Sequence, residues 1–186
     1  CGALLPTGNT VDTIDGVEVT AIDNGMPVVV MRADDLGVRG TESPAELEAD
    51  DALRLRLESI RLRAGRLMQL GDVTDTTVPK LTMVSAPTAG GDISTRTFIP
   101  HRCHEAIGVF GAVSVATAAL LPGTPADDVT RPGAGADGML TCEHPTGTFT
   151  AAIEVDADGD APVVRRAGII RTARKLMDGT VFPAEY

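Results

Sequence analysis

The most informative segment of this chain reads Phe98-Ile-Pro-His-Arg-Cys-His-Glu-Ala-Ile-Gly-Val-Phe-Gly-Ala-Val-Ser-Val-Ala-Thr-Ala-Ala-Leu-Leu-Pro-Gly-Thr124. Sixteen consecutive residues within it, Ala106 to Leu121, carry no charge, and many are Gly, Ala, Ser or Thr. A helix of this composition has no polar face, so we expect protein to enclose it on all sides. It is too short for a membrane span, which needs about 18–20 strongly apolar residues. Its Ser114 and Thr117 are expected to bond back to carbonyls of the helix.

Cationic and titratable side chains gather immediately before this predicted helix. They are Arg96, His101, Arg102, Cys103 and His104. The first N–H groups of a helix lack intrahelical partners, and the helix dipole favours negative charge at the same end. A buried helix that starts at such a cluster is therefore predicted to bind an anion, either a carboxylate or a phosphate.

The composition of the chain narrows the class of protein. Its 186 residues suffice for one sizeable core, which must be aliphatic because there are no Trp, one Tyr and four Phe. A net charge of −10 argues against nucleic acids and anionic membranes as partners. Three cysteines without metal-type spacing predict reduced thiols, no metal site and a cytoplasmic location.

Glycine and proline divide the rest of the chain into strands and one further helix. A capping box at Ser43 to Glu46 predicts a helix that ends at Gly71. Its apolar stripe holds Leu53, Leu57, Ile60, Ala64 and Leu67, whereas Arg54, Glu58, Arg61 and Arg66 are predicted to face solvent. Strands are predicted at 16–22, 26–31, 81–86, 92–98, 139–144, 148–155 and 163–172. The pattern indicates an α+β fold, with strands wrapped around one hydrophobic helix and an amphipathic helix outside.

Several segments resemble one enzyme family in collinear order, over nearly the whole chain. They are Ile22–Val29, Leu57–Leu62, Val78–Lys80, Phe98–Ala112, Glu143–Gly147 and Ile170–Lys175. These segments are similar to the 4-oxalomesaconate tautomerases, which are close relatives of the 2-methylaconitate cis–trans isomerases and more distant relatives of diaminopimelate epimerase.

The resemblance implies a diaminopimelate epimerase-like domain, in which a curled, mostly antiparallel β-sheet surrounds a central helix. Family members contain two such domains with the active site between them. We therefore expect residues 1–186 to form a single domain, the C-terminal half of a two-domain enzyme, with the N-terminal domain as its missing partner. The implied reaction moves a proton within a small tricarboxylate without a cofactor. The main acid/base groups would belong to the other half, so this half alone is expected to be inactive, and a homodimer is left open.

The resemblance also implies candidate site residues at the start of the buried helix. His104 stands where the epimerase has a glutamate, so it is the candidate for proton transfer or substrate contact; the alternative is that it caps the helix. Gly108, Val109 and Phe110 occupy the position of a Cys-Gly-Thr motif and are expected to bind substrate. Gly108 in place of a catalytic cysteine argues against a mechanism with two thiols.

The remaining candidates lie outside that helix. Arg96 is suited to hold a substrate carboxylate through two parallel hydrogen bonds, unless it forms an ion pair on its strand. His101 is a second candidate of this kind. Asn24 and Met26 match a turn that carries a substrate-contacting motif in the epimerase, although an Asn here also suits a turn with positive φ.

Three functions stay open at this point. The first is a 4-oxalomesaconate tautomerase of aromatic-acid degradation, and the second is a 2-methylaconitate isomerase of propionate metabolism. The third is a non-catalytic anion-binding domain that acts alone.

Overall fold

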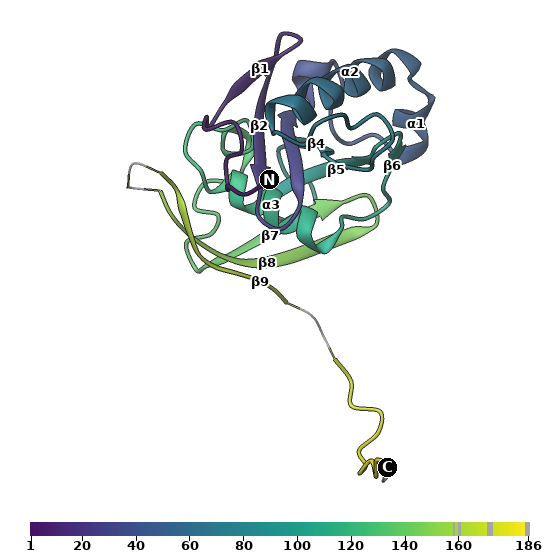
Figure 1. The fold of residues 1–186 in the computed structure, drawn as a ribbon, viewed down its shortest axis with the longest axis vertical. Helices are drawn as coiled ribbons and strands as arrows, with labels where there is room; N and C mark the ends of the chain where they lie inside the picture. The colour runs from purple at the N-terminus through teal and green to yellow at the C-terminus, as the bar shows by residue number, and fades with distance from the viewer. Residues whose placement is uncertain (158, 160, 171–172, 185–186) are drawn as a thin grey trace.

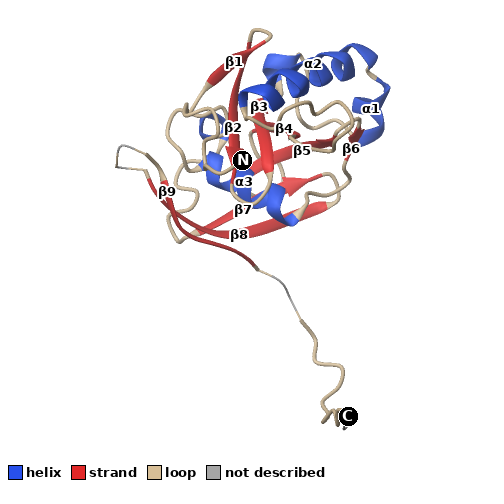
Figure 2. Ribbon diagram, in the orientation of Figure 1, coloured by secondary structure: helices blue, strands red, loops and turns tan. Residues whose placement is uncertain are grey.

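The computed structural model describes residues 1–157, 159, 161–170 and 173–184, and it has one curled β-sheet with helices on both faces (Figures 1 and 2). Its strands are β1 (Asp12–Ile14), β2 (Val17–Asp23), β3 (Pro27–Arg32), β4 (Lys80–Ser85), β5 (Ile93–Ile99), β6 (Arg102–Cys103), β7 (Met139–His144), β8 (Gly147–Asp156) and β9 (Val163–Ile169). Its helices are α1 (Pro44–Ala49), α2 (Asp51–Leu67) and α3 (Val109–Ala119), with short 3-10 turns at Asp34–Leu36 and Asp127–Val129. The predicted α+β class is confirmed, although the predicted end of the last strand, 171–172, lies outside the described residues.

The strands form one mixed sheet in the order β1-β2-β3-β4-β5-β7-β8-β9, with β6 paired to β5. Neighbouring strands run antiparallel except for the β3–β4 and β5–β7 pairs, which are parallel. A parallel pair needs a crossover long enough to hold a helix. The crossover between β3 and β4 contains α1 and α2, and the crossover between β5 and β7 contains α3.

The two crossovers place their helices on opposite faces of the sheet. Along β3, Val28 and Val30 belong to the core around α3, whereas Val29 and Met31 belong to the core under α1 and α2. This alternation follows from the two-residue period of a strand. It explains why β3 is apolar throughout, since both of its faces are covered.

The helix α3 lies inside the curl of the sheet, as the sequence predicts (Figure 1). It contacts β2, β3, β7, β8 and β9. Every residue from Gly111 to Ala119 is buried. Small side chains allow this enclosure because strands can approach the helix axis closely from several directions.

The outer amphipathic helix differs from the prediction in three ways. The predicted capping box is present at Ser43, but the helix breaks at Asp50, whose side chain accepts the N–H of Leu53 at 2.9 Å and starts α2. The helix ends at Leu67, with Met68 instead of Gly71 as its C-cap, and Leu67 is 48% exposed instead of buried. Asp50 breaks the helix because a carboxylate that caps a new first turn competes with continuation of the old one.

The sequence pattern predicts that Arg61 faces solvent, and that prediction is wrong. The side chain is fully buried. Its guanidinium donates twice to the carboxylate of Glu58, at 2.7 and 2.8 Å, and also to backbone carbonyls in the segment 73–78. Arg61 therefore holds the loop that leads into β4, which helical periodicity alone does not reveal.

The C-terminal segment 173–184 extends away from the sheet without helix or strand (Figure 1). It carries Leu176, Met177, Val181 and Phe182, each 86–88% exposed. Within the described residues, none of the helices combines the length and the hydropathy that a membrane crossing requires.

Candidate functional site at the start of the buried helix

The start of α3 is open. Gly108 is its N-cap residue and supplies no side chain, and the N–H of Ala112 makes the first intrahelical bond to the Gly108 carbonyl at 2.8 Å. The N–H groups of the first turn therefore have no intrahelical acceptor. A Cβ atom added at Gly108 or Gly111 would meet no atom within 4 Å. The end of the helix that was predicted to bind an anion is thus accessible to a ligand.

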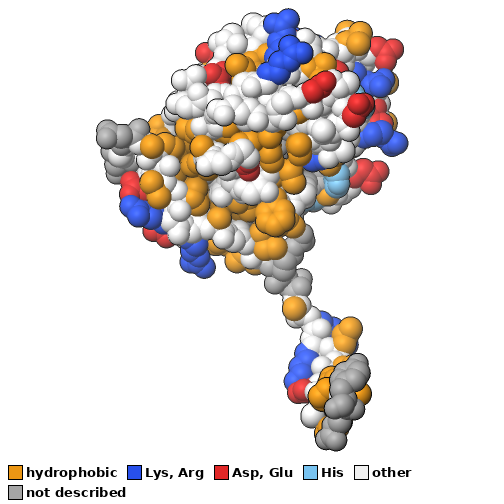
Figure 3. Space-filling model, in the orientation of Figure 1, with side chains coloured by type: hydrophobic (Ala, Val, Ile, Leu, Met, Phe, Trp, Pro, Cys, Tyr) orange, Lys and Arg blue, Asp and Glu red, His pale blue; other side chains and the backbone are white. Residues whose placement is uncertain are grey.

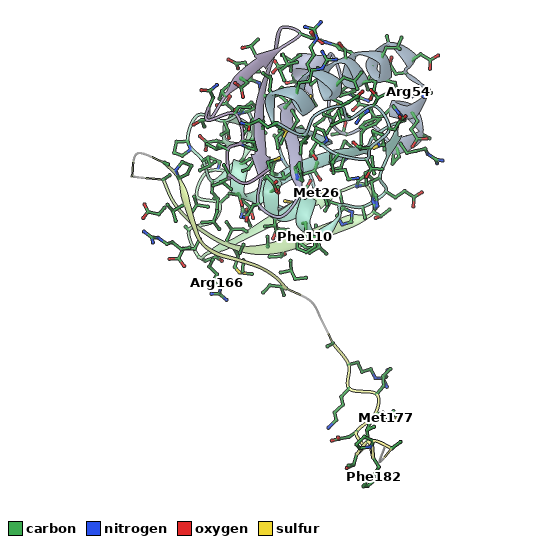
Figure 4. The ribbon with its side chains drawn as sticks, in the orientation of Figure 1. Met26, Arg54, Phe110, Arg166, Met177 and Phe182 are labelled. Atoms are coloured by element: carbon green, nitrogen blue, oxygen red, sulfur yellow. The ribbon has the colours of Figure 1, made fainter. Side chains whose placement is uncertain are left out.

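Apolar side chains surround this open end. Phe110 is 59% exposed and lies close to Met26 in Figure 4, and its ring packs on Gly25, where a Cβ would approach Cδ1 to 3.2 Å. Gly25 has a φ of +92°, which also favours glycine. Figure 3 shows hydrophobic side chains gathered across this face. The helix start therefore combines free N–H groups with exposed apolar side chains beside it.

The turn that joins β2 to β3 is bound to the side of α3. The Asn24 side chain donates to the Thr117 hydroxyl at 2.9 Å, and its backbone N–H donates to the Ser114 hydroxyl at 3.2 Å. Ser114 in turn donates to the Met26 carbonyl at 2.8 Å. The structure thus brings Asn24 and Met26 to α3. The side-chain NH₂ of Asn24 is already used to hold the turn, through its bond to Thr117.

His104 lies on the loop between β6 and α3. Its backbone N–H donates to the Thr97 carbonyl at 2.7 Å, and its ring nitrogen Nδ1 accepts the N–H of Ala106 at 3.0 Å. The ring is exposed. His104 therefore holds the loop before α3 but does not cap the helix, whose start makes no side-chain capping bond. Its Nε2 points away from the contact with Ala106, and its role in substrate contact or proton transfer stays a prediction.

Arg96 lies on β5 and is buried, with 8% of its surface exposed. Its Nε donates to the Glu42 carbonyl at 2.7 Å, and its Nη1 donates to the Thr95 carbonyl at 2.9 Å. Burial lowers the pKa of Arg96, against the opposing effects of nearby acidic groups such as Glu143. The structure therefore engages Arg96 with backbone carbonyls and leaves its role as a carboxylate ligand a prediction.

The other members of the predicted cationic cluster turn toward the outer helices. The His101 Nδ1 lies 3.8 Å from a Glu58 oxygen on α2, and Arg102 lies 3.3 Å from Glu48 on α1. Cys103 is buried, and burial raises the pKa of its thiol to about 11, so the thiol stays protonated at pH 7. Among the described residues, no three His, Cys, Asp or Glu side chains are grouped to hold a metal ion.

The hairpin between β7 and β8 lies beside the loop before α3, although no candidate site residue was predicted in it. The Thr146 hydroxyl donates to the Glu105 carbonyl at 2.8 Å, which joins this hairpin to the loop before α3. The His144 ring lies beside the same hydroxyl, with Nδ1 at 3.3 Å. The segment Glu143–Gly147 is one of those that resemble the tautomerase family, and this similarity is the sequence feature that could have indicated a role for the hairpin.

Glu143, at the end of β7, is a buried carboxylate in a ring of backbone donors. It accepts N–H groups from Thr88, Ala89 and Gly91 at 2.7–2.8 Å. Burial raises the pKa of Glu143 more than any other single influence, but the three N–H donors together outweigh it and hold the pKa below 4.5. Glu143 therefore fixes the loop 88–91 and is not free to act as a base.

Comparisons with known proteins agree with this architecture. A (4E)-oxalomesaconate Delta-isomerase of Novosphingobium sp. (strain KA1) is 54% identical over 98% of this chain and 50% of its own length. A 4-oxalomesaconate tautomerase of Pseudomonas putida is 55% identical over 97% of this chain and 49% of its own length. The chain thus spans about half the length of these relatives.

The crystal structure of a methylitaconate-delta-isomerase shares the fold, with a TM-score of 0.75 at 23% identity over 91% of this chain and 50% of that one. The family model described as PrpF protein matches residues 1–183. A match over almost every residue, together with the shared fold, means that this chain belongs to the PrpF protein family.

Proposed function

We propose that this chain is part of an isomerase that moves a proton within 4-oxalomesaconate, an unsaturated tricarboxylic keto acid, in the degradation of aromatic acids. The observation that carries the proposal is the identity of 54% and 55% to two relatives named for oxalomesaconate, over nearly all of this chain. The open start of α3 supports it, because a substrate with three carboxylates suits free N–H groups at a helix end.

We further propose that residues 1–186 form a diaminopimelate epimerase-like domain and correspond to the C-terminal half of a two-domain enzyme. Two observations support this arrangement. The chain spans half the length of its relatives, and the apolar face around Phe110 is exposed where a second domain would cover the helix start. The active site would then lie between the two domains, and this half would be inactive alone.

The chemistry divides between the two halves. Tautomerisation removes a proton from one atom of the substrate and returns one to another through a dienolate, so it needs a base and donors for the spreading negative charge. The first N–H groups of α3 and the Nε2–H of His104 suit the second task. Each oriented donor of this kind contributes about 3 kcal/mol to lowering the barrier.

The proposed substrate-binding residues follow from this division. Gly108, Val109 and Phe110 would lie against the substrate, with Asn24 and Met26 at the adjacent turn. Arg96 and His101 rank below them, because their nitrogens contact the backbone or α2. We also propose that the enzyme is cytoplasmic, which its three free cysteines support.

An activity assay on the full-length protein that contains this chain tests the proposal. We expect turnover of 4-oxalomesaconate, followed by its ultraviolet absorbance, at a kcat/KM well above that for 2-methylaconitate. This chain alone should be inactive, and adding the other half should restore turnover. Absence of turnover in the full-length protein, combined with tight tricarboxylate binding by this chain alone in calorimetry, would instead favour a stand-alone binding domain.

A further inference from the structure

Two histidines, His104 on the loop before α3 and His144 on the hairpin bonded to that loop, each make a hydrogen bond that fixes the tautomer of the ring. For His104, the N–H of Ala106 donates to Nδ1 at 3.0 Å. A backbone amide can only donate, so Nδ1 must carry a lone pair there. The proton of the neutral His104 ring is therefore on Nε2, which becomes a hydrogen-bond donor.

The second histidine, His144, is fixed in the opposite tautomer. The Thr146 hydroxyl has one proton, and it uses that proton on the Glu105 carbonyl at 2.8 Å, because a carbonyl can only accept. In the contact of 3.3 Å between Thr146 Oγ1 and His144 Nδ1, the histidine must therefore donate. The neutral ring of His144 then has its lone pair on Nε2, which becomes a hydrogen-bond acceptor.

The surroundings of His144 favour its neutral ring. Burial is the main cause that lowers the pKa of His144 below 6.5, and the charges of His104 and Arg96 lower it further, against the carbonyls of Glu105 and Thr148. His144 is therefore mostly neutral at pH 7. The bond between Thr146 and Glu105 joins its hairpin to the loop of His104.

We propose that His104 and His144 form a donor–acceptor pair for a hydroxylated or enolic polycarboxylate at the start of α3. In this pair, His104 Nε2–H donates to a carboxylate or carbonyl oxygen, and His144 Nε2 accepts the O–H of an adjacent hydroxyl or enol. The inference deepens the proposed function, on which it rests for the substrate class, because an enol tautomer presents this combination of groups. His144 thereby becomes a specificity residue for the hydroxyl-bearing form.

The tautomers can be measured without turnover. This chain has three histidines, so long-range ¹H–¹⁵N correlation spectra of ¹⁵N-histidine-labelled protein give three ring patterns, which His101→Gln and His144→Asn assign. We expect an Nε2–H pattern for His104 and an Nδ1–H pattern for His144 at pH 7.5. An Nε2–H pattern for His144 would overturn the proposal.

Ligand selectivity provides the second measurement. Citrate and tricarballylate each carry three carboxylates, and they differ in one hydroxyl. We expect citrate to bind this chain about tenfold tighter, the value of one hydrogen bond, and to shift the signals of both histidines. Equal affinities, or a His144 signal that ignores citrate, would refute the pair.

Two variants separate the pair from a structural role. In His144→Asn, the amide N–H replaces Nδ1 and keeps the bond to Thr146 while the acceptor is removed, so the tenfold preference for citrate should disappear. In Thr146→Val, both rings remain but the His144 tautomer is released, so a mixed pattern and a reduced preference are expected. A preference that survives in both variants would contradict the proposal. If both histidines show the expected tautomers but the full-length protein does not turn over 4-oxalomesaconate, the proposed function is wrong and the histidine pair is not.

Discussion

Replacing Arg61 by Met should destabilise the protein strongly, although the residue lies on a helix whose charged side chains mostly face solvent. Met preserves length and helix propensity while it removes the guanidinium. The change leaves the Glu58 carboxylate without its two donors. It also removes the donor to backbone carbonyls of the segment 73–78, among them the Val73 carbonyl, which Arg61 contacts at 2.8 Å. The variant therefore measures the effect of losing the buried charge with little change in packing.

The expected loss follows from the burial of the pair. Removing one partner of a buried ion pair costs about 3–5 kcal/mol. The Glu58 side chain is 25% exposed, so water can solvate part of its charge, and we expect the lower end, about 3 kcal/mol. Such a loss is a large share of the roughly 5–15 kcal/mol that stabilises a typical domain.

Urea unfolding of the Arg61→Met variant, followed by far-ultraviolet circular dichroism, measures this loss, since the chain has no Trp for fluorescence. The matched control is Arg66→Met on the exposed side of the same helix, where we expect a change within about 0.5 kcal/mol. Equal small effects for both variants would show that the guanidinium of Arg61 is solvated, and the reasoning would fail.

Three further predictions concern Glu143, Gly91 and Asn24. Glu143→Gln should lower the free energy of unfolding most above pH 4.5, because the pKa of the folded carboxyl is depressed; this difference should shrink as pH falls below 4.5, which urea titrations at several pH values would test. Gly91→Ala should cost about 1–3 kcal/mol, since its Cβ would approach Glu143 Cγ to 2.6 Å, and an unchanged melting temperature would contradict this. Asn24→Ala should cost about 1 kcal/mol through the lost bond to Thr117, whereas Asn9→Ala at an exposed site should cost less in the same urea assay.

The elements that could be predicted are those whose residue types indicate the same secondary structure and the same burial that the structure shows. The uncharged run 106–121 indicates a helix enclosed by protein, and α3 is buried from Gly111 onward. Most predicted strands lie within one residue of the observed bounds, because Gly and Pro mark the turns between them. In each case, a single sequence pattern predicts both the secondary structure and the burial of the segment.

The errors arise where a side chain is held by residues far along the chain. Periodicity puts Arg61 on the polar side of α2, but the segment 73–78 folds over it and supplies acceptors that no helical pattern shows. Asp50 is similar, since a carboxylate in the middle of a helical pattern can either stay exposed or cap a new helix. In the structure, Asp50 caps the new helix through the N–H of Leu53.

The candidate site divides in the same way. Adjacency in sequence grouped His101 with His104, yet one contacts Glu58 on α2 and the other bonds to Ala106 before α3. The loop of His104 is instead joined to the hairpin of His144, through the bond between Thr146 and Glu105 that spans 41 positions. Clusters in sequence therefore indicate a candidate region, and the sheet topology decides which of its segments lie together.

The composition of α3 has a further consequence for how the site is held. Thr117 bonds back to the Val113 carbonyl as predicted, but Ser114 donates to Met26 and accepts from Asn24 instead. A helix with larger or apolar residues at these positions would keep the turn at a distance and leave its N–H groups without partners. The hydroxyls therefore fix the turn to the same rigid helix that presents the open N-terminus. It follows that the turn and the helix end must move together, as a site that aligns several groups of one ligand requires.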